Sequence, residues 1–238
     1  MQDKRTYLQR NNHNMLLLER LISLYAPHCC LGCGAENDVL MCESCRAVTP
    51  LVPSRCYRCR SVTREFAVCE SCRKHTALRQ VLVATHYEGV AKELLHKVKY
   101  ERGRSGIVEM VELMAPLLHL LPQDAVFVPV PTATSRVRQR GYDQAVLLAR
   151  AISREWGLDV ADVLVRLGQA HQVGSNRRDR LLHLKGAFRV QRTARIHGAH
   201  VVLVDDVLTT GATVETAARV LKKAGAKQVD ALIFSQAG

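Results

Sequence analysis

Two carboxylates followed by a hydroxyl-rich turn are the part of the sequence best suited to chemistry. Residues 201–213 read VVLVDDVLTTGAT, so an apolar run precedes Asp205 and Asp206. Backbone N–H groups at the start of a helix attract anions, and a glycine lets the backbone approach a phosphate closely. Carboxylates repel a phosphate but suit sugar hydroxyls. The pattern therefore predicts a sugar-phosphate site formed by Asp205, Asp206, Thr209, Thr210, Gly211, Ala212 and Thr213.

A helix cap is the simpler interpretation of this turn, because threonine is a common N-cap residue. Capping accounts for one threonine. It does not account for two adjacent aspartates at the end of an apolar run, nor for three threonines and a glycine in one turn. We therefore favour the binding site.

Eight cysteines form four Cys-x-x-Cys pairs, a spacing that is typical of tetrahedral metal sites. Two residues between thiolates let both sulfurs reach one ion, and two pairs complete a Cys₄ shell around zinc. Eight and nine residues separate the pairs within each half of the segment. The predicted structural zinc sites are Cys30, Cys33, Cys42 and Cys45, and Cys56, Cys59, Cys69 and Cys72.

Disulfides are the competing interpretation of these cysteines. The sequence shows no secretory signal, so we expect a cytoplasmic, reducing compartment in which thiols persist. An iron–sulfur cluster or an interleaved pairing stays open, and Cys29 could replace Cys30 or remain a free thiol. Because so small a segment offers almost no hydrophobic core, metal binding should supply its folding energy.

The remaining sequence alternates strand and helix patterns, which predicts a mostly parallel sheet flanked by helices. Strands are expected at 80–86, 125–130, 186–190, 200–205 and 228–234, and helices at 89–98, 106–120, 143–156 and 213–224. The apolar run 201–204 is typical of a central strand covered on both faces. The expected organisation is an amphipathic helix within 1–27, a double Cys₄ module at 28–75 and an α/β domain at 80–238.

The chain carries 34 basic and 22 acidic residues, a net charge of +12. Such an excess favours anionic partners such as phosphates or nucleic acid, although solubility alone is the simpler explanation. The longest apolar run near the N-terminus has four residues, too few to span a membrane. Basic residues gather in three places after the cysteines: around Lys99, around Arg136, Arg138 and Arg140, and in the polar stretch 167–185.

These motifs together resemble the ComF family, also called GntX, from about Leu21 to the C-terminus. Residues 201–213 fit the type I phosphoribosyltransferase pattern at every position. The other landmarks are the cysteine pairs, Tyr87-Glu88-Gly89, Lys97-Val98-Lys99-Tyr100, Val128-Pro129-Val130-Pro131, Arg140-Gly141-Tyr142-Asp143-Gln144 and Gly186-Ala187-Phe188. The sequence departs from the family at Tyr142-Asp143, where Phe-Asn is common, and at His183, where Asn is common.

The resemblance implies a type I phosphoribosyltransferase-like fold, a site for phosphoribosyl pyrophosphate (PRPP) with Mg²⁺, and a role in competence, that is, in DNA uptake and transformation. It implies that Arg136, Arg140 and Lys99 lie on the pyrophosphate side, and that Arg177, Arg178 and Arg180 lie on a flexible loop over the site.

Three functions follow from the resemblance. The favoured one is a DNA-uptake accessory that binds PRPP, a 5′-phosphorylated nucleotide or a single-stranded DNA end, together with uptake-machinery proteins. The second is an active Mg²⁺-dependent phosphoribosyltransferase, a glycosyltransferase whose acceptor the sequence does not name. The third is a zinc-stabilised scaffold with a vestigial site. Neither the oligomeric state nor the partner of the zinc modules, DNA or protein, follows from the residues.

Overall fold

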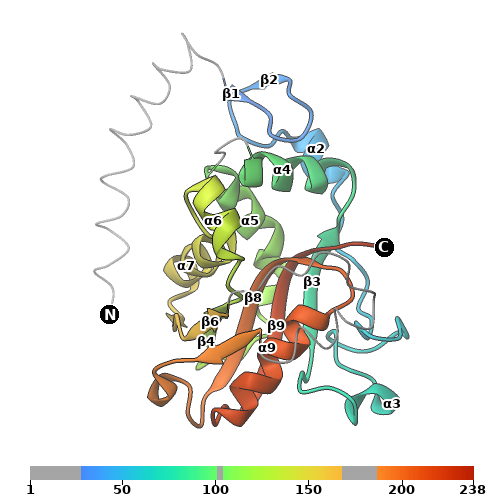
Figure 1. The fold of residues 1–238 in the computed structure, drawn as a ribbon. Coiled ribbons are helices and arrows are strands. Elements are labelled where there is room, and N and C mark those ends of the chain that lie inside the picture. The colour runs from blue at the N-terminus through green and yellow to red at the C-terminus, as the bar shows by residue number, and fades with distance from the viewer. Residues whose placement is uncertain (1–27, 101–103, 168–186) are drawn as a thin grey trace, which may run out of the picture.

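The computed structural model describes residues 28–100, 104–167 and 187–238. Within these ranges a parallel sheet carries helices on both faces, and the cysteine-rich segment packs along its outside (Figure 1). The expected helix within 1–27 and the three arginines Arg177, Arg178 and Arg180 lie outside the described residues. No helix in the described ranges has the length and apolarity that a bilayer span requires.

Five parallel strands form the main sheet, as the alternation of strands and helices predicts. Their order is β3-β9-β8-β4-β5. The central strand β8 is apolar and fully buried over residues 201–204, because neighbouring strands and helices cover it on all sides. The strands are β3 (Val81–His86), β4 (Val126–Pro129), β5 (Asp159–Val160), β8 (His200–Leu208) and β9 (Gln228–Gln236).

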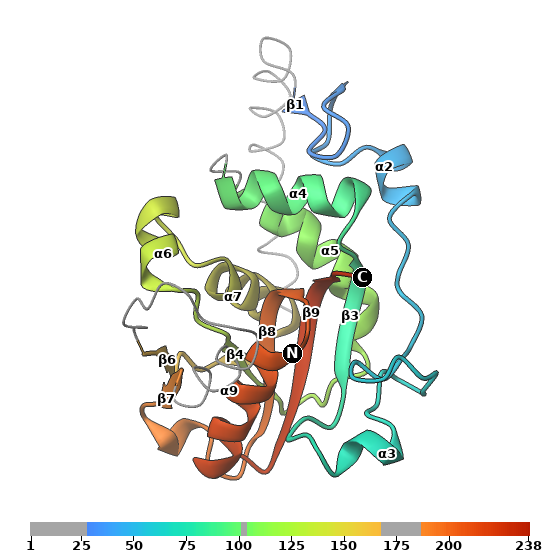
Figure 2. The same ribbon diagram turned by 45° about the vertical axis from the view of Figure 1, so that its right-hand side comes forward.

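Helices on opposite faces of this sheet create a switch point between β4 and β8. The chain leaves β4 through α7 toward β5 and leaves β8 through α9 toward β9, so α7 and α9 cover opposite faces (Figure 2). Ligands in open α/β sheets bind at the carboxyl ends of the strands beside such a point. The helices are α4 (Gly89–Tyr100), α5 (Gly106–Leu118), α6 (Thr134–Arg140), α7 (Gln144–Trp156) and α9 (Ala212–Lys223).

Three local predictions differ from the structure. The strand expected at 186–190 is β7 (Phe188–Val190), which pairs antiparallel with β6 (Leu164–Arg166) in a separate two-stranded sheet. A short apolar run gives no information about its partner, and here β5 already closes the edge of the main sheet. Strand β8 continues through both aspartates to Leu208. The arginine-rich segment after β4 forms helix α6, which the expected helix ranges do not include, although a solvated basic helix start is the alternative interpretation of these arginines.

The cysteine-rich segment folds into two modules that dock at different places. The first Cys₄ module, residues 28–49, contains β1 (His28–Cys29), β2 (Glu36–Asn37) and α2 (Glu43–Ala47). The second Cys₄ module, residues 52–75, contains α3 (Glu70–Arg73). The first module lies beside α4 and α5, whereas the second lies along the edge strand β3 (Figure 2). Backbone hydrogen bonds join the second module to β3, from Val52 N–H to the Ala84 carbonyl and from Val81 N–H to the Phe66 carbonyl.

Candidate functional site

The aspartate pair and the hydroxyl-rich turn lie at the carboxyl end of the central strand β8. Gly211 is the N-cap residue of α9, with φ +75°, a left-handed conformation that glycine adopts without strain. Thr209 and Thr210 are exposed at the turn, and Thr213 is half-buried in the first turn of α9. The Ala212 N–H donates to the Thr210 hydroxyl at 3.4 Å, and the N–H groups at such a helix start favour an anion.

The two aspartates differ in their electrostatic surroundings. Lys99 Nζ, at the end of α4, lies 2.8 Å from Asp206 Oδ2, and both side chains are mostly buried. Asp205 Oδ1 accepts a hydrogen bond from the Asp206 backbone N–H at 2.8 Å. Burial, and then the charge of Asp206, raise the pKa of Asp205 well above its ordinary value. Asp206 therefore has the cationic partner, while Asp205 takes up a proton more readily than an ordinary aspartate.

The loop after β4 lies on the other side of the switch point and is held by Asp143. Asp143 Oδ2 accepts from the Thr132 N–H at 2.8 Å, and Oδ1 accepts from the Thr132 hydroxyl at 3.1 Å. Oδ1 also accepts from Ala145 N–H at 3.0 Å and so caps α7. One carboxylate thus fixes both the loop and the following helix, which is a role that the cap position alone would not have predicted.

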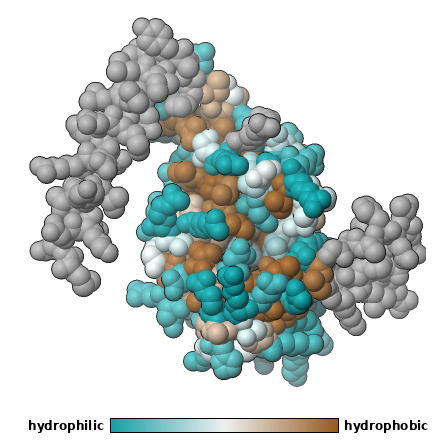
Figure 3. Space-filling model, turned by 60° about the vertical axis from the view of Figure 1, so that its left-hand side comes forward, coloured by the Kyte–Doolittle hydropathy of each residue, from teal (hydrophilic) through white to brown (hydrophobic). Residues whose placement is uncertain are grey.

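A basic pocket borders the aspartate pair and shares Lys99 with it. A hollow of about 260 Å³ is lined by Lys99, Tyr100, Gln139, Arg140 and Tyr142. A second hollow of about 410 Å³ adjoins it and is lined by Arg104, Arg138, Gln139, Arg140, Gly141 and Tyr142. Among the described residues, neither lining contains an acidic side chain. Hydrophilic and apolar side chains alternate on the face that carries α6 and α7 (Figure 3).

Arginine and tyrosine side chains pair within this basic pocket. The Arg140 guanidinium lies 5.0 Å from the Tyr100 ring centroid and donates to the Tyr100 hydroxyl at 3.3 Å. The Arg104 guanidinium lies 4.7 Å from the Tyr142 ring centroid. The structure thus brings Lys99 and Arg140 together, two of the three residues expected on the pyrophosphate side. Arg136 is exposed on α6 and lines neither hollow of this pocket, where Arg138 and Arg104 stand instead.

Each cysteine cluster has the geometry of a tetrahedral thiolate site. The four Sγ atoms of each cluster lie within 4.8 Å of one another, including 3.9 Å from Cys33 to Cys42 and 3.5 Å from Cys59 to Cys69. Four sulfurs at the Zn–S distance stand about 3.8 Å apart. The clusters could therefore each hold an ion such as zinc, and they are Cys30, Cys33, Cys42 and Cys45, and Cys56, Cys59, Cys69 and Cys72. Cys29 is exposed and belongs to neither.

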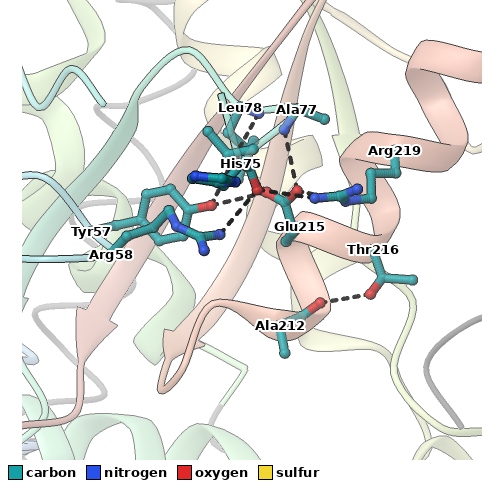
Figure 4. Close-up of polar contacts among 10 residues, drawn as sticks. Tyr57, Arg58, His75, Ala77, Leu78, Ala212, Glu215, Thr216 and Arg219 are labelled. Atoms are coloured by element: carbon teal, nitrogen blue, oxygen red, sulfur yellow. Dashed lines mark hydrogen bonds and ion pairs between the residues drawn. The ribbon is translucent and has the colours of Figure 1, made fainter. Parts of the chain in front are cut away.

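The second Cys₄ module touches residues 209–213, the turn that the sequence predicts to bind phosphate (the phosphate turn), and sequence reasoning did not predict this contact (Figure 4). Tyr57 donates its hydroxyl hydrogen to Glu215 Oε2 at 2.9 Å, and the Thr76 hydroxyl donates to the same oxygen. Burial, reinforced by the charge of Glu215, raises the pKa of Tyr57 to about 12, so the phenol keeps its proton. The Tyr57 ring also lies against Gly211. The sequence offered no signal for this contact beyond an aromatic residue next to Cys56.

The fold and the two cysteine clusters define a class of protein: a phosphoribosyltransferase-like α/β domain with two Cys₄ modules. A sequence profile described as the phosphoribosyl transferase domain matches residues 143–236, which include the aspartate pair and the turn. The parallel sheet, its switch point and this match agree on the fold that the resemblance implied.

Relatives along most of the chain identify the family. Competence protein ComFC of Bacillus subtilis is 31% identical over 204 residues, which cover 80% of this chain and 81% of ComFC. DNA utilization protein YhgH of Escherichia coli is 28% identical over 79% of this chain and 87% of YhgH. Competence protein F of Haemophilus influenzae is 28% identical over 84% of this chain and 93% of its own length. The chain therefore belongs to the ComF family of competence-associated, phosphoribosyltransferase-like proteins.

Proposed function

We propose that this protein is a cytoplasmic DNA-uptake accessory that binds PRPP, or the 5′-phosphorylated end of a nucleotide or single strand, in its phosphoribosyltransferase-like site. One observation carries the proposal. Asp205, Asp206 and the turn before α9 stand at the switch point of the sheet, and Lys99 joins them to a pocket that Arg140 also lines. The ribose, the 5′-phosphate and a second anionic group of one ligand can then bind side by side.

Each part of the site has a chemical role in this proposal. The N–H groups and hydroxyls of residues 209–213 bind the 5′-phosphate, and Asp205 and Asp206 accept hydrogen bonds from the ribose hydroxyls. Lys99 and Arg140 contact the pyrophosphate, since guanidinium and ammonium groups suit phosphate oxygens. Mg²⁺ bound with PRPP would neutralise part of the pyrophosphate charge. Zinc in the two cysteine clusters would hold the modules folded.

The basic pocket favours a single-stranded DNA end as a second ligand for the same site. Tyr100 is 57% exposed, and Arg140 lies against its ring. Exposed aromatic rings stack on bases while neighbouring arginines contact the backbone, which is how proteins bind single strands without sequence preference. The relatives named for competence and DNA utilization agree with such a ligand.

Calorimetry with PRPP and Mg²⁺ tests the phosphoribosyl site. We expect binding by the zinc-loaded protein and its loss in Asp205→Asn/Asp206→Asn. Asp162→Asn is the matched control, because this exposed aspartate follows β5 and lies outside the site. Absence of binding by the unchanged protein would overturn the proposal and leave the scaffold role. Consumption of PRPP with an added acceptor would show that the protein is a transferase.

A pair of oligonucleotides tests the DNA end. A 5′-phosphorylated single strand should bind more tightly than the same strand with a 5′-hydroxyl, and PRPP should compete with the first. Affinity should fall as salt rises, because lysine and arginine contacts to phosphates release counterions. Equal affinity for the two strands, without competition by PRPP, would place DNA outside this site.

A further inference from the structure

Tyr57 forms a wall of the phosphate turn. A Cβ atom added to Gly211 would lie 2.7 Å from Tyr57 Cε2 and 2.9 Å from Cδ2, closer than real Cβ contacts. Gly211 is therefore required both by its left-handed backbone and by the ring beside it. Tyr57 directly follows Cys56, so an ion in the second cluster fixes the backbone from which the ring extends. The Tyr57 side chain thus connects the second cysteine cluster to the turn.

Glu215 is the anchor of this contact on the side of α9. It lies one turn after Gly211, and its N–H donates to the Gly211 carbonyl at 2.9 Å. Its carboxylate accepts from the Tyr57 hydroxyl, from the Thr76 hydroxyl and, at 3.2 Å, from Ala77 N–H. These three donors come from the second Cys₄ module and the segment that follows it, as Figure 4 shows.

The remaining donor to Glu215 comes from α9 itself. Arg219 Nε lies 2.7 Å from Glu215 Oε1, and the Arg219 side chain is 56% exposed. An exposed ion pair of this kind offsets the negative charge of Glu215 only weakly. Without the second module, the carboxylate of Glu215 would stand in the first turn of α9 with this one partner. A negative charge there opposes the binding of a phosphate at the same helix start.

We propose that the second Cys₄ module holds the phosphate turn in its binding conformation, with Tyr57 and Glu215 as positioning residues. Loss of the ion from this module then weakens phosphate binding twice, by freeing the turn and by freeing the Glu215 carboxylate. The proposal rests on the proposed function of the turn. The described contacts of the first Cys₄ module are with α4 and α5 and not with the turn, so an ion bound there would not hold the turn.

Matched cysteine variants test the proposal by calorimetry with PRPP and Mg²⁺. Cys59→Ser/Cys69→Ser should lower the affinity about tenfold or more, while Cys33→Ser/Cys42→Ser should stay within about threefold. Adding Glu215→Gln to Cys59→Ser/Cys69→Ser should recover at least about threefold, because the amide removes the repelling charge. A merely structural role predicts no such recovery, and equal losses in the two cysteine pairs would overturn the proposal.

Two variants of Tyr57 keep the test valid if the cysteine variant fails to fold. Tyr57→Ala retains all eight thiols but removes both the ring and the hydroxyl, and should lower the affinity about tenfold. Tyr57→Phe retains the ring against Gly211 and should stay within about threefold. Unchanged affinity in Tyr57→Ala would overturn the role of the ring.

Hydrogen exchange of the backbone amides of residues 209–214 separates this proposal from the proposed function, because it needs no ligand. Exchange should become faster in Cys59→Ser/Cys69→Ser and in Tyr57→Ala, and should not change in Cys33→Ser/Cys42→Ser. If the unchanged protein binds no PRPP, the exchange rates still decide whether the second module holds the turn. If PRPP binds and these rates match in all variants, the proposal is wrong while the proposed function stands.

Discussion

The two Cys₄ modules share a ligand set but are attached to the α/β domain in different ways. The first module is attached through Arg46, which pairs with Glu109 at 2.6 Å and with Glu112 at 2.7 Å on α5. Arg46 and Glu112 are both more than one-third exposed, so water screens their pair, whereas the Glu109 side chain is buried. The first module is thus attached to α5 through Arg46 and also contacts α4, the helix whose end carries Lys99, through the Cys30 carbonyl and Lys97.

The second module is attached through buried contacts next to the phosphate turn. Tyr57 is 7% exposed and the Glu215 side chain 13% exposed. Backbone hydrogen bonds also join the module to the edge strand β3, which leaves fewer groups of that strand open to pairing with another chain. Clusters of the same four thiols thus have different surroundings, one beside α4 and α5 and the other beside β3 and the turn.

The largest expected effect concerns the stability of the α/β domain when each module loses its ion. Cys59→Ser/Cys69→Ser should lower the free energy of unfolding by about 3–5 kcal/mol, because the β3 edge and the donors to Glu215 are lost together. Cys33→Ser/Cys42→Ser should cost about 1 kcal/mol. Denaturant unfolding followed by the fluorescence of Trp156, the single tryptophan, measures both. Equal costs would break the comparison.

The next effect concerns Asp230, which pairs with Arg79 in the segment that follows the second module. Asp230 is fully buried and pairs with Arg79 at 2.6 Å and with His200 at 2.7 Å. Burial alone would raise the pKa of Asp230, but hydrogen bonds from His200 and Arg79 outweigh it and lower this pKa. Asp230→Asn should cost about 3 kcal/mol at pH 7, because a neutral amide replaces the buried carboxylate that accepts hydrogen bonds from Arg79 and His200.

The pH dependence of this cost has a definite sign. A lowered folded-state pKa gives stability that is present above the unfolded pKa of about 3.9 and is lost as pH falls through the folded value. Glu109 in the attachment of the first module has the opposite sign. Burial raises its pKa, only partly offset by Arg46, so its contribution is lost as pH rises through the folded value. In unfolding curves measured between pH 7 and pH 2, Asp230→Asn should be less stable than the unchanged protein at pH 7 and Glu109→Gln more stable, and both differences should shrink as pH falls toward 2.

A smaller effect compares Glu215, which accepts hydrogen bonds from the second module, with Arg46, which attaches the first module to α5. Glu215→Ala leaves the Tyr57 and Thr76 hydroxyls without their acceptor and should cost about 2 kcal/mol. Arg46→Ala removes a screened partner of Glu109 and should cost about 1 kcal/mol. Thermal unfolding of both variants gives the ranking. A larger cost for Arg46→Ala would show that the first attachment is the stronger one.

The smallest effect isolates the contact between Tyr57 and the turn. Gly211 and Gly34 both have left-handed backbones, with φ +75° and φ +78°, but nothing lies near Gly34. Gly34→Ala should cost about 1 kcal/mol from backbone strain alone. Gly211→Ala should cost about 1 kcal/mol more, because its methyl group meets the Tyr57 ring. Equal costs, measured by denaturant unfolding, would show that the ring moves aside freely.

Much of the α/β domain could be predicted from local pattern. The strands and helices of the main sheet lie close to their expected positions, because their apolar periodicity is strong and their ends carry glycine or polar residues. The strand at 188–190 pairs with β6 in the small antiparallel sheet and not in the main sheet, and a run of three residues carries no information about the strand with which it pairs. Helix α6 lies outside the expected helix ranges, because none of its residues is buried and no apolar periodicity therefore marks it.

The sequence by itself determined the cysteine grouping, the parallel sheet and the place of the hydroxyl-rich turn at the start of a helix, because each depends on residues close together in the chain. Only the tertiary structure decided that Lys99 reaches Asp206, that Arg140 rather than Arg136 lines the adjoining pocket, and that Tyr57 stands against Gly211. Such pairs join residues that are far apart in sequence. Their meeting depends on how the helices and modules pack around the sheet, and packing leaves no periodic trace in the order of the residues.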